Sequence, residues 1–171
     1  MEKQKLQRFI DKYHLSGNVN SVVLNSVGNT LETRFITGDK SLLGELSMNS
    51  WKFEDINLGV YDTEQFSRLL GVLSDDVQIK LTKSGDKAIS LEVSDSYSKF
   101  NFMLSDLSVI NTPPELKTLP EFQLKIKVDT RFITTFIAGK SALPDTDTFS
   151  VLSNNDVVKL VIGHSSINTN K

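Results

Sequence analysis

The stretch Ile56-Asn57-Leu58-Gly59-Val60-Tyr61-Asp62, in the middle of the chain, has the pattern of a strand that leads directly into a helix. Its apolar residues predict a strand over 56–61, and Asp62 or Thr63 is a typical N-cap for a helix that continues to about Leu73. The inward face of this helix is expected to carry the apolar residues that recur at helical spacing: Phe66, Leu69, Leu70 and Leu73. A strand that leads directly into a capped helix is therefore the pattern to look for elsewhere in the sequence.

Three strands are expected after this helix, so that residues 56–104 form one module. Apolar and polar residues alternate over 77–82 and again over 89–93, which is typical of half-buried strands. Ser84-Gly85-Asp86 lies between these two stretches and predicts a hairpin turn. A last strand over 97–104 completes the order strand, helix and three strands.

Residues 1–48 show an earlier copy of the helix and its three strands. A helix is predicted before the stop signal Ser16-Gly17-Asn18, because four apolar residues recur at helical spacing: Leu6, Phe9, Ile10 and Tyr13. Strands are expected over 19–25, 31–37 and 42–48. The short turns between them indicate antiparallel hairpins.

A third copy follows residues 105–120, a connector that holds three of the four prolines. The alternating residues Phe122 to Val128 predict a strand, Asp129 is expected to open a helix, and a hairpin is expected over 148–163. Four, seven and eight residues after Asp62 and after Asp129, the residues are apolar, which indicates an internal repeat. The sequence thus predicts a first domain over 1–104, the connector over 105–120 and an incomplete second domain over 121–171.

The composition is that of an ordinary globular protein, with 39% hydrophobic and 23% charged residues. No apolar run approaches the roughly 20 residues of a membrane span, and residues 1–5 lack the apolar core of a signal peptide. The absence of cysteine excludes a disulfide scaffold, a thiolate zinc site and a thiol nucleophile. We therefore expect an intracellular protein without a membrane partner.

Residues suited to catalysis or metal binding are scarce. The two histidines, His14 and His164, have no cysteine partners, and the acidic residues at 75–76 and 145–147 are expected to form turns. The phosphate-loop, nucleophile-elbow and metal-helix motifs do not occur. The sequence predicts no catalytic residue, no metal and no cofactor, so an enzyme on an unrecognised α+β fold is the weakest interpretation.

A short basic stripe marks the outward face of the first predicted helix. Lys5, Arg8 and Lys12 fall close together at 100° per residue, on the side away from the apolar face. With a net charge of -2, the protein can contact nucleic acid only through such local clusters. An ordinary solvated helix face explains the same pattern.

The segment 56–62, followed by Phe66, residues 69–73 and Asp75-Asp76, resembles the middle of the first domain of sliding clamps from T-even-type bacteriophages. The rest of the chain is similar to that family in element order more than in residue identity. The resemblance implies an α+β, DNA-clamp fold, in which repeated strand-helix-three-strand modules place helices on one face of antiparallel sheets.

The resemblance also implies a function without catalysis. Members of this family form a homo-oligomer, a trimeric ring that encircles double-stranded DNA, tethers DNA polymerase as its processivity factor and is opened by an ATP-driven clamp loader. In phages of this type the clamp on DNA also helps to activate late transcription in the cytoplasm of the host cell. A phage structural or assembly protein of antiparallel β type is the alternative, and the basic helix stripe favours the clamp.

Two sets of residues are expected to carry this function. Contacts with DNA phosphates are predicted for basic residues on outward helix faces: Lys5, Arg8, Lys12, Arg68 and Arg131. A groove for partner peptides is predicted from apolar residues in or beside the connector: Leu107, Val109, Ile110, Leu116 and Leu119. For each residue an ordinary role is the alternative, a surface charge in the first set and a contact that pins the connector to the sheet in the second.

The chain departs from the family in the number of its modules. The family subunit has four modules, whereas this sequence supplies two complete ones and a third that stops after two hairpin strands. We interpret it as a truncated sequence or as a shortened relative that assembles differently. Its last part is expected to have exposed sheet edges and an incomplete core, and to pair with the same region of another chain.

Overall fold

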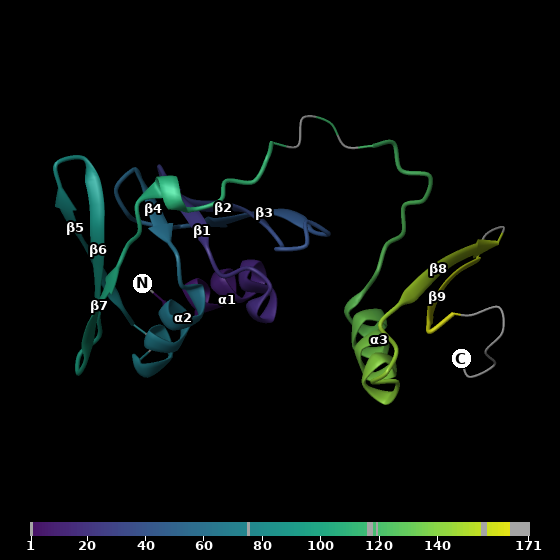
Figure 1. Ribbon diagram of the computed structural model, residues 1–171. Helices are drawn as coiled ribbons and strands as arrows, with labels where there is room; N and C mark the ends of the chain where they lie inside the picture. The colour runs from purple at the N-terminus through teal and green to yellow at the C-terminus, as the bar shows by residue number, and fades with distance from the viewer. Residues whose placement is uncertain (1, 75, 116–117, 119, 155–156, 165–171) are drawn as a thin grey trace. The chain divides into compact units, whose positions relative to one another are not determined.

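The computed structural model describes residues 2–74, 76–115, 118, 120–154 and 157–164 (Figure 1). The chain divides into two compact units, Met1–Leu116 and Lys117–Lys171. In the described ranges, no helix is long and apolar enough to span a membrane.

Two antiparallel sheets build the first unit (Figure 1). The first sheet has the strand order β3-β2-β1-β4. Its strands are β1 Val22–Val27, β2 Thr30–Ile36, β3 Leu43–Asn49 and β4 Ile56–Val60. The second sheet has the order β5-β6-β7. Its strands are β5 Gln78–Ser84, β6 Lys87–Ser94 and β7 Lys99–Met103. The expected hairpins are confirmed, with strand ends shifted by a few residues.

Two helices, α1 (Lys3–His14) and α2 (Thr63–Val72), contact each other and share one hydrophobic core with both sheets. The apolar face predicted for α1 is buried. Phe66 and Leu70 of α2 and Leu73 directly after it are also buried, while Leu69 is half-buried. A short 3-10 turn, Leu15–Gly17, ends α1. Alternating residues of β1 and β2 complete the core, because every second side chain of a strand points to the same face.

Polar contacts beside and within this core fasten the two helices to each other. The Gln7 Nε2 donates to Ser67 Oγ at 2.5 Å, and the Lys3 ammonium donates to the carbonyl of Leu73. The Thr63 hydroxyl lies 3.4 Å from the Tyr13 hydroxyl, and burial raises the pKa of Tyr13. Tyr13 therefore stays neutral and serves as a core residue that links α1 to the start of α2.

The chain leaves the second sheet across β4 and then forms a short 3-10 turn, η2 (Leu107–Val109). The amide of Ser105 donates to the carbonyl of Gly59 at 2.9 Å. A Cβ at position 59 would lie 2.2 Å from the Ser105 carbonyl oxygen, so only glycine permits this close crossing. The beginning of the predicted connector is thus held directly against the sheet.

The described residues of the second unit form one helix, α3 (Thr130–Ala142), and one hairpin, β8 (Phe149–Asn154) with β9 (Val157–Ile162). Asp129 caps α3 as expected, because its Oδ1 accepts from the amide of Phe132 at 2.7 Å. Phe136 meets Phe149 edge to face, with ring centroids 5.4 Å apart. None of the described side chains of this unit is buried.

The prediction of a strand over Phe122 to Val128 is wrong. In the structure these residues form no strand, and all their side chains are exposed. The physical reason is the lack of a partner, because β8 and β9, the strands described in this unit, pair with each other. An alternating segment becomes a strand only when a neighbouring edge satisfies its backbone groups.

Candidate nucleic-acid interface

The basic stripe of α1 lies on the exposed surface of the first unit, opposite the buried face of the helix. Lys5, Arg8 and Lys12 are all exposed. The Lys5 ammonium pairs with Glu2 at 3.5 Å, whereas Arg8 and Lys12 form no ion pair with any described residue. Two cations of the stripe are therefore free to meet a phosphate without first breaking an internal contact.

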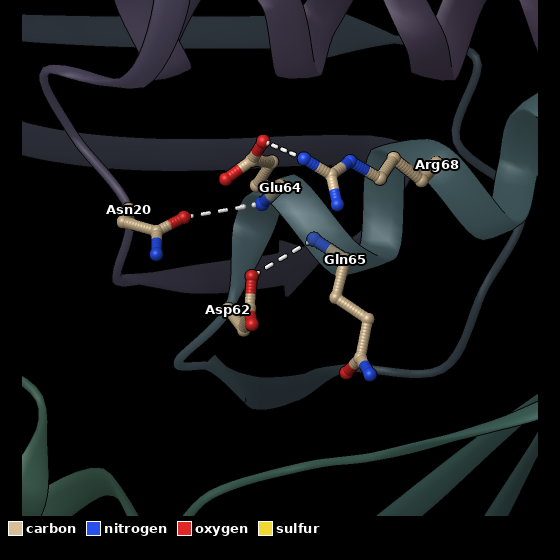
Figure 2. A network of polar contacts seen from close by, with 5 residues as sticks. All are labelled: Asn20, Asp62, Glu64, Gln65 and Arg68. Atoms are coloured by element: carbon tan, nitrogen blue, oxygen red, sulfur yellow. Dashed lines mark hydrogen bonds and ion pairs between the residues drawn. The ribbon is translucent and has the colours of Figure 1, made fainter.

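Arg68 lies on the exposed face of the neighbouring helix α2, but its charge is already balanced. Figure 2 shows the guanidinium turned toward the carboxylate of Glu64, one helical turn away, with which it forms an ion pair. The sequence interpretation missed this partner, although Glu and Arg four residues apart on a helix are a standard pair. Arg68 is therefore a weaker phosphate ligand than Arg8 or Lys12.

The N-terminus of α2 is fixed by side chains that the sequence predicted only in part. The predicted cap Asp62 accepts from the amide of Gln65 at 2.8 Å (Figure 2). Asn20, from the segment before β1, accepts from the amide of Glu64 at 3.1 Å, and its own carbonyl accepts from the amide of Thr63 at 2.9 Å. These contacts tie α2 to the first module and so hold the two basic helix faces in one fixed arrangement.

Arg131, the last predicted phosphate ligand, lies on α3 of the second unit and is exposed. It forms no ion pair with a described residue. Thr134 and Thr135 share its helix face, and each hydroxyl donates to the backbone carbonyl four residues earlier at 2.9 Å. The side chain of Arg131 is thus a free cation on a neutral helix face.

The residues predicted for a peptide groove have different roles at the start of the connector. Leu107 lines a cleft of about 340 Å³ together with other residues that include Ile56, Ala88 and Ile89. Val109 is 61% exposed but does not line this cleft. Ile110 is buried, with its Cδ1 close to Gly59, and therefore pins the connector to β4. Leu116 and Leu119 lie outside the described residues.

An ion pair forms one rim of this cleft, and sequence reasoning did not find it because its partners lie far apart in the chain. The Lys87 ammonium lies 2.9 Å from Asp106 Oδ2. The hydrogen bond from Lys87 lowers the pKa of Asp106, and the amide of Ser108 lowers it further. Asp106 therefore stays ionised, and it both caps η2 and fixes the position of Leu107 at the cleft.

The described residues contain no group of three or more histidine, cysteine, aspartate or glutamate side chains arranged to hold a metal ion. The exposed cations of α1 and the cleft beside Leu107 are thus the features that the fold and the sequence interpretation both single out. The first suits anionic phosphates, and the second suits a small apolar group.

No family model matches the chain, and no curated protein matches it. Among solved structures, a chain of the PCNA2–PCNA3 complex from Sulfolobus tokodaii is similar with a TM-score of 0.61 and 13% sequence identity, over 95% of this chain and 70% of that chain. This chain has a DNA-clamp fold. The DNA polymerase III subunit beta from Pseudomonas aeruginosa gives a TM-score of 0.42 and 14% identity, over 67% of this chain and 32% of that chain.

The clamp fold agrees with the predicted α+β architecture of helices on one face of antiparallel sheets. At this level of identity the similarity establishes the fold alone. The closer resemblance to clamps of T-even-type bacteriophages is not tested by these comparisons and stays a prediction.

Proposed function

We propose that this protein is a sliding clamp, a DNA polymerase processivity factor that encircles double-stranded DNA as part of a homo-oligomeric ring. The observation that carries the proposal is the combination of a DNA-clamp fold with exposed, unpaired Arg8 and Lys12 on α1. In this proposal α1 and α2 face the DNA, while the sheets form the outside of the ring.

The modest charge of the protein supports sliding rather than tight binding. A ring is retained on DNA by its topology, so that its contacts need only be weak, sequence-independent and readily exchanged. A net charge of -2 with the unpaired cations Arg8 and Lys12 on α1 suits that requirement. A uniformly basic surface would bind the duplex more tightly and slow the exchange of these contacts.

The partners follow from the same proposal. The cleft beside Leu107 suits a short apolar motif, through which DNA polymerase would be tethered. An ATP-driven clamp loader would open the ring, and the source of the protein would be a bacteriophage that uses the clamp in the cytoplasm of its host, for replication and for late transcription. The ring is expected to be trimeric.

The charge of α1 can be tested by measuring binding to a fluorescent duplex at several salt concentrations. Arg8→Ala with Lys12→Ala is expected to weaken binding and to lower the slope of log affinity against log salt by about 0.9 per lost phosphate contact. Lys40→Ala with Lys159→Ala is the matched control, because it removes the same charge from exposed positions outside the helices that, like Arg8 and Lys12, form no ion pair with a described residue. Equal effects of the two double variants would contradict the proposed orientation of the helices.

A further inference from the structure

The strand β5 forms a free edge of the second sheet. Among the described strands it pairs with β6 alone. Its exposed residues include Gln78, Lys80 and Thr82, while Ile79 and Leu81 are half-buried on the side of the core. A free edge of this kind presents a row of backbone donors and acceptors that another extended segment can satisfy.

The chain itself shows which segment pairs at this edge. Glu2, directly before α1, forms an isolated antiparallel bridge with Asp76, two residues before the start of β5. The backbone segment directly before the first helix therefore lies in the position of an antiparallel neighbour of β5. The bridge lies just before the start of β5 and leaves the strand itself open.

The residues Phe122 to Val128 occupy the same place before α3 that Glu2 occupies before α1. They alternate between apolar and polar side chains, yet they form no strand and expose their apolar side chains, with Phe122 69% exposed. We call this segment the unpaired strand. Its side chains alternate as in a half-buried strand, but it pairs with no described strand. The outer edge of β5, in turn, has backbone donors and acceptors that no described strand satisfies.

A cleft beside β5 offers room for the apolar side of such a segment. It has a volume of about 650 Å³, and its apolar wall includes Trp51, Phe53 and Ile79. The rings of Trp51 and Phe53 lie 5.4 Å apart, centroid to centroid. An aromatic side chain from an added strand would extend this pair and remove the half-buried ring of Phe53 from water, whereas the ring of Trp51 is already buried.

We propose that the unpaired strand of a second copy of the chain adds to the β5 edge in antiparallel orientation, with an apolar side chain in the cleft beside Trp51. The contact joins two different surfaces, so copies associate head to tail. A second copy is favoured over the chain's own segment because the connector leaves the first unit over β2, where Arg34 lies 3.4 Å from Glu115. β2 belongs to the sheet that does not contain β5.

The charges at this contact largely balance one another. Lys125 and Lys127 share the polar side of the unpaired strand and would lie beside Lys80 of β5, which pairs with Glu92 of β6 at 3.8 Å. Repulsion between the lysines and attraction to Glu92 oppose each other, and salt screens both. Association through β5 is therefore expected to depend on its apolar side and only weakly on salt.

Sedimentation of the full chain over a range of concentrations tests the apolar side of the contact. Leu124→Asp is expected to weaken association at least tenfold, because it puts a charge where a leucine would be buried. Gln123→Asp is the matched control, since it adds the same charge on the polar side, and it should leave association unchanged or stronger. Leu124 is 42% exposed, so its replacement does not threaten folding. Equal behaviour of both variants, or a wild-type chain that stays monomeric, would overturn the proposal.

Cysteine pairing tests the partner directly, because the chain contains no cysteine. A chain with Thr82→Cys is mixed with a tagged chain that carries Gln123→Cys, Lys125→Cys or Lys127→Cys. The proposal expects a mixed disulfide for at least one of these pairs, at several times the yield obtained with the exposed control Ser141→Cys. Equal yields with the control would overturn pairing between copies. A doubly substituted chain that formed the disulfide only within itself would overturn it as well. The result does not depend on DNA binding, so the proposed clamp function can fail or hold independently.

Discussion

The helices α2 and α3 begin in the same way and end up in opposite environments. Asp62 and Asp129 each cap the helix that follows through the amide three residues later. On α2 the apolar face is buried against α1 and both sheets, whereas Ile133 and Ile137 on α3 remain 48% and 59% exposed. The comparison shows that the local sequence determines the helix, while a neighbouring module determines whether its apolar face becomes a core.

The same difference separates the sheets of the two units. In the first unit, seven strands in two sheets enclose a shared core, and the helices are fastened to each other by Gln7 and Ser67. In the second unit, β8 and β9 form a hairpin with one helix beside it. A hairpin and a helix expose too much apolar surface to be as stable as the complete unit.

The largest predicted effect is the loss of a phenylalanine from each helix. Phe66→Ala on α2 should cost about 3–5 kcal/mol, because Phe66 is buried and contacts Phe100 and Phe102. Phe136→Ala on α3 should cost roughly 1 kcal/mol or less, since Phe136 is only half-buried beside Phe149. Unfolding by urea measures both costs.

Two spectroscopic signals distinguish the unfolding of the first unit from that of the second in this experiment. Trp51, the single tryptophan, is buried in the first unit and donates to Ser26 Oγ at 3.0 Å, so its fluorescence follows that unit alone. Circular dichroism follows all helices. If Phe136→Ala shifted the Trp51 transition as far as Phe66→Ala does, the contrast between the units would be wrong.

A second contrast concerns one glycine in each unit, with effects of opposite sign. Gly59→Ala should destabilise the first unit by about 2 kcal/mol, because its Cβ would clash with the Ser105 carbonyl. Gly139→Ala should stabilise α3 by about 0.5–1 kcal/mol, since alanine favours the helix and the new Cβ would meet only the tip of Ile162, at 3.1 Å. Thermal unfolding measures both changes, and effects of the same sign would contradict this comparison.

The sequence predicted well what depends on local pattern. The buried faces of α1 and α2, the caps at Asp62 and Asp129 and the antiparallel hairpins follow from periodicity and turn residues, and the structure confirms them. Whether residues Phe122 to Val128 form a strand could not be predicted in this way, because their alternation does not show whether a neighbouring strand edge is available to pair with them.

The candidate site was predictable to a similar degree. Periodicity placed Lys5, Arg8 and Lys12 on the exposed face of α1, as the structure has them. It could not show that Ile110 is buried or that Lys87 pairs with Asp106, because both contacts join segments far apart in the chain. Tertiary packing decides which side chains of a connector remain accessible.

The caps themselves provide a smaller test of the comparison. Asp62→Ala and Asp129→Ala each remove one hydrogen bond to a helix amide and should cost about 1 kcal/mol. The cost in α2 should appear as a lower free energy of unfolding of the first unit, because that helix is part of its core. The cost in α3 should appear as lost helicity at moderate temperature. Asp62→Asn and Asp129→Asn, which preserve a side-chain acceptor, are expected to restore most of each loss.

The smallest effect is a pH dependence that belongs to the first unit. The Thr37 hydroxyl, followed by the amide and hydroxyl of Ser41, lowers the pKa of Asp39 from 3.8 to about 2. The ionised form is favoured in the folded state, so this contribution is complete above pH 3.8 and is lost as the pH falls toward about 2. The Trp51 transition of Asp39→Asn should therefore depend less on pH in this window than that of the wild type. Because Asp39 is fully exposed, salt should reduce the difference, and an equally steep pH dependence in both proteins would show that the turn does not stabilise the unit.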